Sequence, residues 1–139
     1  MVLAVYRARR RIANRLDAVI LSPFAPPLRT ALSAASKMHG HEREISELGN
    51  VFRKLSGLVA YADPARWSPA DLRPYVEHVI ECFGWDRVMF GSDWPVCTLS
   101  ATLKQWVNTL LLLTQSGGEE NRSKLFYDNA AAVYRLTVC

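Results

Sequence analysis

The chain has 139 residues, of which 50% are hydrophobic and 22% are charged, and its formal net charge is +4. This balance is typical of one soluble globular domain and excludes a chain that is largely disordered. No apolar run reaches the roughly 18–20 residues that a membrane span requires, and no nucleic-acid-binding pattern accompanies the basic charge.

The positive charge is concentrated near the N-terminus. Residues 1–40 contain seven basic residues and one aspartate, whereas residues 41–139 contain ten basic and twelve acidic residues. Within residues 3–20, apolar side chains recur at helical spacing between the arginines, which predicts a basic amphipathic helix. We therefore expect residues 1–40 to be a basic extension, helical or poorly ordered and unrelated to the rest, and residues 41–139 to be the globular domain.

Two features bear on the compartment in which the chain functions. Cys82, Cys97 and Cys139 are odd in number and form no CxxC motif, which is typical of reduced thiols in an intracellular protein. The expected location is therefore the cytoplasm. The arginine-rich, acid-poor start also resembles a mitochondrial transit peptide, so a mitochondrial location is the alternative.

Beyond residue 41, apolar strands alternate with amphipathic helices. In chain order we predict a helix over Glu42–Leu48, a strand over Asn50–Ser56, a loop over Leu58–Trp67, a helix over Ser68–Phe83, a strand over Arg87–Phe90, a helix over Thr102–Thr114 and helical segments over Glu119–Phe126 and Asn129–Leu136. The helix that begins at Ser68 has the clearest start, because a serine N-cap is followed by proline and a carboxylate. Asn129 is predicted to cap the last segment. Strands separated by helices are typical of an α/β fold with a parallel sheet.

In such sheets, side chains that bind or react lie where the strands end. The second strand runs into the segment Gly91–Pro95, where Asp93 follows a glycine and a serine. The Asp93 carboxylate could accept a proton from water or bind a metal ion through oxygen. The alternative is that Asp93, together with Ser92, only caps a turn or a helix start. The first strand ends at Lys54–Gly57, at the same edge of the predicted sheet.

Three segments resemble a known family in this order. They are NVFRKLSGL (Asn50–Leu58), FGWDRVMFGSDWPV (Phe83–Val96) and KLFYDNAAAVYRL (Lys124–Leu136). Together they look like the C-terminal part of the amidohydrolase-related family, of the amidohydrolase 2 type, which includes sugar-lactone and pyrone-dicarboxylate lactonases. The resemblance extends from about Glu44 to Leu136.

The resemblance implies an α/β fold that is the C-terminal portion of a (β/α)₈ TIM barrel, about its last two βα units. It also implies that Asp93 activates the hydrolytic water and, in metal-dependent members, binds the metal. Trp94 would line the substrate pocket. Lys54 and Ser56 lie where the preceding strand opens toward the site, so they are the other candidates for substrate binding. The cofactor implied for metal-dependent members is a divalent metal such as zinc.

The chain departs from this family in its length and in its histidines. A complete (β/α)₈ barrel needs about 200–250 residues, and barrels of this family bring histidines from other strands to hold metal or substrate. His39 and His41 form a His-x-His motif that no apolar strand precedes, so we interpret them as part of a surface loop. His78 falls in the middle of a predicted helix, as a structural or solvated residue.

These observations predict a truncated hydrolase whose substrate is a small lactone or cyclic ester. Asp93 would assist the attack of water, and the chain would be weakly active or inactive by itself. One alternative is a non-catalytic interaction fragment that pairs with another barrel chain, or with itself, through exposed strand edges. The other alternative is an incomplete gene model. Neither nucleic acid nor a membrane is expected as a partner.

Overall fold

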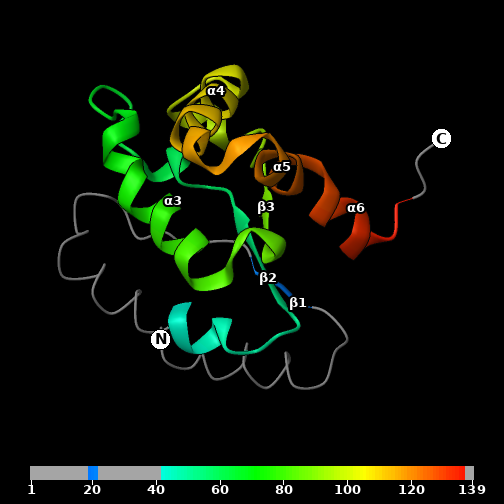
Figure 1. Cartoon of the computed structure of the whole chain (residues 1–139). Helices are drawn as coiled ribbons and strands as arrows, with labels where there is room; N and C mark the ends of the chain where they lie inside the picture. Colours follow the sequence, from blue (N-terminus) through cyan, green and yellow to red (C-terminus); the bar gives the residue numbers. More distant parts are fainter. Residues whose placement is uncertain (1–18, 22–41, 137–139) are drawn as a thin grey trace.

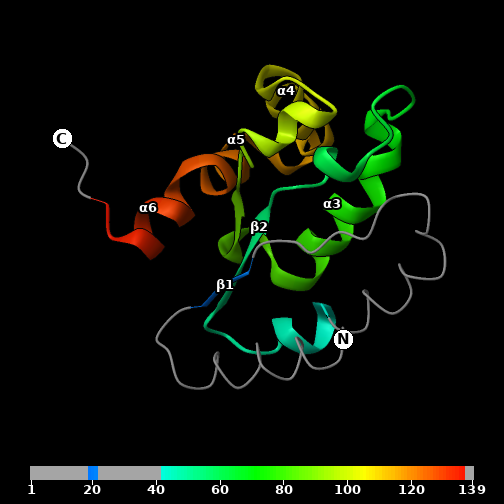
Figure 2. The ribbon, with the colours of Figure 1, turned by 180° about the vertical axis from the view of Figure 1, so that it is seen from behind.

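The computed structural model describes residues 19–21 and 42–136 of the chain. Within them, three short strands form one parallel sheet in the order β1 (Val19–Leu21), β2 (Val51–Leu55) and β3 (Val88–Phe90). Figures 1 and 2 show α3 to one side of these strands and α6 to the other. The predicted parallel α/β arrangement is therefore confirmed for this part of the chain.

Strand β1 lies where the sequence pattern predicts the end of an amphipathic helix. Val19 pairs with Val51 and Leu21 pairs with Arg53 in a parallel ladder. The helix prediction, which ended at residue 20, is wrong for Val19 and Ile20. A short apolar run fits a helix and a strand equally well, and its pairing with β2 is a long-range contact. The sheet consequently has a third strand beyond the two predicted. The rest of the predicted helix, residues 3–18, lies outside the described residues, and the domain division at residue 40 stays a prediction.

The helices follow the predicted order with small differences at their ends. Residues 42–46 are helical, and the later elements are η2 (Val59–Tyr61), α3 (Pro69–Phe83), η3 (Trp85–Arg87), η4 (Val96–Leu99), α4 (Leu103–Leu113), η5 (Gln115–Gly117), α5 (Gly118–Ser123), η6 (Lys124–Asp128) and α6 (Asn129–Tyr134). The last three elements form one continuous helical stretch through a π-helical turn at η6, where the sequence pattern predicts two segments. None of the helices in the described part combines the length and the apolar character needed to span a bilayer.

The start of α3 is built as the sequence predicts. Ser68 donates hydrogen bonds from its backbone N–H and its hydroxyl to the Asp71 carboxylate, at 2.8 and 2.7 Å, and Pro69 occupies the first helical position. These bonds stabilise the ionised carboxylate and therefore lower the pKa of Asp71 below its ordinary value. Capping of this kind fixes the first residue of the helix, because it satisfies backbone donors that have no partner within the helix.

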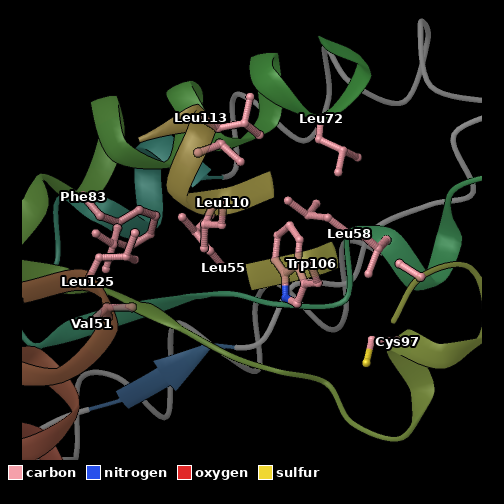
Figure 3. Close-up of a cluster of buried hydrophobic side chains, with 14 of the residues drawn as sticks. Val51, Leu55, Leu58, Leu72, Phe83, Cys97, Trp106, Leu110, Leu113 and Leu125 are labelled. Carbon is pink, nitrogen blue, oxygen red and sulfur yellow. The ribbon is translucent and has the colours of Figure 1, made fainter. Parts of the chain in front are cut away.

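The hydrophobic core lies between the sheet and the helices. Along β2, Val51, Arg53 and Leu55 are buried while the intervening residues are only partly so, which is the period-two pattern of a strand with one face against a core. Figure 3 shows Leu55 near Leu110 and Trp106 of α4, with Val51 farther along β2 in the same cluster. Lys54, which alternates with them, belongs to the other face of β2.

Asn129 anchors the last helix to β3. The sequence pattern predicts that this residue is an N-cap, but that prediction is wrong because the helix already continues through Asp128. Instead, the buried Asn129 amide donates hydrogen bonds to the backbone carbonyls of Trp85 and Val88, each at 2.7 Å. One side chain therefore satisfies the first carbonyl of β3 and that of Trp85 in η3, and it fixes the strand against the helix.

We expect Asn129→Leu to lower the free energy of unfolding by about 2–4 kcal/mol, because leaving a buried carbonyl unsatisfied costs about 1–3 kcal/mol. Chemical denaturation of the full chain measures the change. The matched control is Asn121→Leu, since Asn121 is only partly buried and its amide bonds one carbonyl, that of Gly117. Equal losses in the two variants would contradict the anchoring role of Asn129.

Candidate active site

The ends of β2 and β3 meet at one edge of the sheet. The strands run parallel, with Leu55 opposite Phe90, so their carboxyl ends lie together. The Gly91 N–H donates a hydrogen bond of 3.0 Å to the Leu55 carbonyl oxygen and extends the pairing one residue beyond β3. The two predicted candidate segments, 54–57 and 91–95, are thereby brought side by side.

Gly91 lies directly against the end of β2. A Cβ atom added to Gly91 would lie 2.6 Å from the Cβ of Ser56 and 3.7 Å from the Cδ of Lys54. A glycine is required here because any side chain would overlap Ser56. The structure therefore brings together two of the predicted substrate-binding residues, a buried Ser56 and a partly buried Lys54, beside the segment that leads to Asp93.

Asp93 adopts a left-handed backbone conformation, with φ of 53°. Aspartate tolerates this region better than most residues, and such conformations are concentrated at functional sites. Its backbone carbonyl accepts a hydrogen bond of 2.8 Å from the Cys97 N–H, which fixes the turn into η4. The hydroxyl of Ser92 accepts the Trp94 N–H at 3.3 Å.

The Asp93 carboxylate itself is uncommitted. Within residues 19–21 and 42–136, it makes neither a hydrogen bond nor an ion pair. The turn is therefore capped by Ser92 alone, and the capping alternative for the Asp93 side chain receives no support. Partial burial raises the pKa of Asp93 above its ordinary value, because desolvation disfavours the charged form.

Trp94 follows Asp93 and is mostly exposed. Its side chain is 67% exposed, and the peptide bond to Pro95 is cis. Val96 and Leu99, the first and last residues of η4, are exposed as well. Trp94 thus lies at the correct edge of the sheet, while its place in a substrate pocket stays a prediction.

Trp106 of α4 holds the end of β3 in place, a role that sequence reasoning missed. The buried indole donates a hydrogen bond of 3.0 Å from Nε1 to the Gly91 carbonyl oxygen, and its ring lies 6.3 Å from that of Phe90. The signal that could have found it is a tryptophan on the apolar face of a predicted helix. A buried indole N–H needs an acceptor, so such a residue indicates a hydrogen bond to another element. Its acceptor could not be predicted from periodicity.

Tyr134 is a second residue that sequence reasoning missed. The Nζ atom of Lys54 lies 5.4 Å from the centre of the Tyr134 ring, a cation–π contact between β2 and α6. Tyr134 lies within the third segment of the family resemblance, but nothing in the sequence connects it to Lys54.

The described residues do not form a metal site. No three histidine, cysteine, aspartate or glutamate side chains gather among them. His78 lies on α3 with its Nε2 atom 3.5 Å from the Cys82 sulfur, and the predicted His-x-His loop lies outside the described residues. Asp93 could supply one zinc ligand, but the described residues do not complete a zinc site.

Comparison with known proteins agrees with the motifs at this edge. A family model described as amidohydrolase matches residues 31–136. The chain is 34% identical over 115 residues to the L-fucono-1,5-lactonase of Burkholderia multivorans. This match covers 75% of this chain and 37% of that protein. It is also 34% identical over 68 residues to the L-rhamnono-gamma-lactonase of Scheffersomyces stipitis. That match covers 45% of this chain and 20% of the relative.

Solved structures show the same likeness. The fold superposes with a TM-score of 0.85 on an amidohydrolase from Burkholderia multivorans with bound zinc, at 30% sequence identity. The match covers 96% of this chain and 50% of that chain. The chain thus spans half of this solved structure and less than half of the curated relatives it matches.

We expect Gly91→Ala to destabilise the fold by about 1–3 kcal/mol, because the added methyl overlaps Ser56. The double variant Gly91→Ala with Ser56→Gly should recover much of this loss, since it removes the overlapping atom. A double-mutant cycle of unfolding free energies measures the coupling. Gly49→Ala is the control, because its new methyl meets no atom within 4 Å. Purely additive effects at residues 56 and 91 would refute the contact.

The raised pKa of Asp93 predicts a pH-dependent stability. The folded state favours the protonated form, so the contribution is favourable below the unfolded pKa and is lost as pH rises through the folded pKa. Asp93→Asn should therefore gain stability relative to the native chain as pH rises from about 3 to about 7. Denaturant titrations at several pH values measure this difference.

Asp71→Asn serves as the control of opposite sign for this measurement. The pKa of Asp71 is lowered by its bonds to Ser68, so its contribution is present above the unfolded pKa and is lost as pH falls. Asp71→Asn should therefore be least stable relative to the native chain near neutral pH. The same trend in both variants would contradict the assignment for Asp93.

Proposed function

The chain belongs to the amidohydrolase family, and from this premise we propose that it is the C-terminal part of a (β/α)₈ hydrolase of lactones or related cyclic esters. The support for the reaction type comes from relatives named L-fucono-1,5-lactonase and L-rhamnono-gamma-lactonase. Support for the barrel comes from the parallel β1–β3 sheet with its helices and from the half-length match to a solved amidohydrolase.

One observation carries the assignment of Asp93 as the general base. Its carboxylate stands at the end of β3 with no partner among the described residues, although Ser92, Gly91 and Trp106 fix the backbone around it. A side chain that is held by its backbone but uncommitted at its carboxylate is free to accept a proton from a bound water. The raised pKa of Asp93 brings its basicity closer to what that role requires.

The proposed reaction begins when Asp93 accepts a proton from a water molecule whose oxygen bonds to the lactone carbonyl carbon. The carbonyl electrons move onto the carbonyl oxygen. When this intermediate collapses, the bond between that carbon and the ring oxygen breaks, and the ring oxygen takes the proton from Asp93. The product is a hydroxy acid, which releases its acidic proton to solvent.

Three neighbouring side chains would bind the substrate in this scheme. Lys54 and Ser56 flank Gly91, and Trp94 follows Asp93 with an exposed aromatic face suited to a sugar ring. In a metal-dependent barrel Asp93 would also supply one ligand, and the other ligands would come from residues outside the described part of the chain. By itself the chain is expected to be weakly active or inactive.

A chimera tests the proposal. The segment of the Burkholderia multivorans L-fucono-1,5-lactonase that this chain matches is replaced by residues 31–136, and hydrolysis of L-fucono-1,5-lactone is followed. We expect the chimera to hydrolyse the lactone, and Asp93→Asn within it to lower kcat by about 10²–10⁴, the usual contribution of a general base.

The control is Asp63→Asn, an aspartate that bonds the backbone of its own loop through the Ala65 N–H. It should leave kcat close to that of the unmodified chimera. A folded chimera with no activity, or one whose activity survives Asp93→Asn, would contradict the assignment of Asp93 as the general base.

A non-catalytic interaction fragment is the second candidate, and one feature of β3 favours it. Gly91 bonds toward β2, so by strand alternation the N–H and C=O of Phe90 point to the other edge, where no other described strand lies. This edge is where a further barrel strand would pair. An inactive but folded chimera would favour this candidate over the hydrolase.

A further inference from the structure

Lys54 is a cation at the candidate site without an anionic partner. It is partly buried, and within residues 19–21 and 42–136 no carboxylate lies within ion-pair distance of its ammonium group. Its Nζ atom instead faces the ring of Tyr134 at 5.4 Å. A cation that is partly removed from water needs compensation, and one aromatic ring supplies only part of it.

A second partly buried lysine shows how this chain otherwise balances such a charge. Lys124 bridges two carboxylates, that of Asp86 at 3.0 Å and that of Glu120 at 3.2 Å, and these bonds raise its pKa. Lys54 has an aromatic ring where Lys124 has two anions. The Lys54 charge is thus positioned by Tyr134 but is balanced by no carboxylate of the described residues.

Lys54 lies at the same edge of the sheet as Asp93. The Cδ atom of Lys54 lies 3.7 Å from the position that a Cβ of Gly91 would take, and Gly91 is two residues before Asp93. The lysine stem therefore lies along the edge that carries the candidate base. Its face of β2 is the one opposite Val51 and Leu55, so it is directed away from the core between β2 and α4. The free cation and the uncommitted carboxylate therefore belong to the same end of the sheet.

We propose that Lys54, oriented by the Tyr134 ring, is the subsite for the negative oxygen that ring opening creates: first the oxyanion of the intermediate, then the carboxylate of the hydroxy acid. This inference rests on the proposed lactone hydrolysis and adds the ligand group that Lys54 binds. The lactone is neutral while both later species are anionic, so the site discriminates between substrate and product by charge. Tyr134 is a positioning residue in this scheme, since it acts through Lys54.

Binding of L-fuconate to the full chain tests the subsite directly, without requiring catalysis. The probe is compared with L-fucitol, which has the same carbon chain and no carboxylate. Calorimetry measures the affinity, and the ¹³C shift of the Lys54 Cε atom reports contact. We expect L-fuconate to bind at least about tenfold more tightly than L-fucitol, because its carboxylate adds a charge-assisted hydrogen bond. Its affinity should fall with added salt.

Variants separate a charge effect from a packing effect. Lys54→Met should reduce L-fuconate affinity about tenfold or more and leave L-fucitol unchanged, whereas Lys54→Arg should retain most of the preference. Tyr134→Phe keeps the ring and should bind like the native chain, while Tyr134→Leu should bind more weakly. Lys104→Met, at an exposed lysine of α4, is the matched control and should have no effect.

The outcomes distinguish this inference from the proposed function. Equal binding of L-fuconate and L-fucitol, or binding that survives Lys54→Met, overturns the subsite even where the chimera hydrolyses lactones. Selective L-fuconate binding that depends on Lys54 supports the subsite even where the chimera is inactive, and then only the hydrolase assignment fails. Because Lys54→Arg and Tyr134→Leu are read alongside Lys54→Met, one variant that fails to fold does not remove the test.

Discussion

The candidate site depends on how firmly β3 is held. This strand has only three residues, and a short parallel strand gains little stability from its own ladder. Two side chains from distant helices fix it instead. The Asn129 amide binds the Val88 carbonyl at its start and the Trp85 carbonyl in η3, and the Trp106 indole binds the Gly91 carbonyl just beyond its end. Between these points Phe90 packs on the rings of Trp106 and Phe126.

This arrangement allows Asp93 to be positioned by its backbone alone. Gly91 is pressed against Ser56, Ser92 caps the turn, and the Asp93 carbonyl binds the Cys97 N–H. The carboxylate is then partly desolvated but not engaged, which raises its pKa and leaves both oxygens available. Asp71 shows the opposite pattern, because its carboxylate accepts hydrogen bonds from Ser68 and its pKa is lowered.

The same edge carries opposite charges that do not pair with each other. Asp93 follows β3, and Lys54 lies at the end of β2 over the Tyr134 ring. A general base and a cation that balances a developing oxyanion are two requirements of lactone hydrolysis. Among the described residues no three metal-binding side chains gather. The match to the zinc-bound amidohydrolase covers half of that structure, so further groups of the family's site would lie in the other half.

The sequence by itself determined the elements whose signals are local, and it identified the amidohydrolase family from three motifs. The capping of α3 by Ser68 and Asp71, strand β2 and the position of Asp93 at a strand end all follow from neighbouring residues. Contacts between distant residues decided the rest. Strand β1 pairs with β2, Asn129 binds carbonyls 44 and 41 residues earlier, and Lys54 meets Tyr134 only after α6 has returned to the sheet. Periodicity and capping rules describe the chain over a few turns, so partners that only the tertiary fold brings together lie beyond their reach.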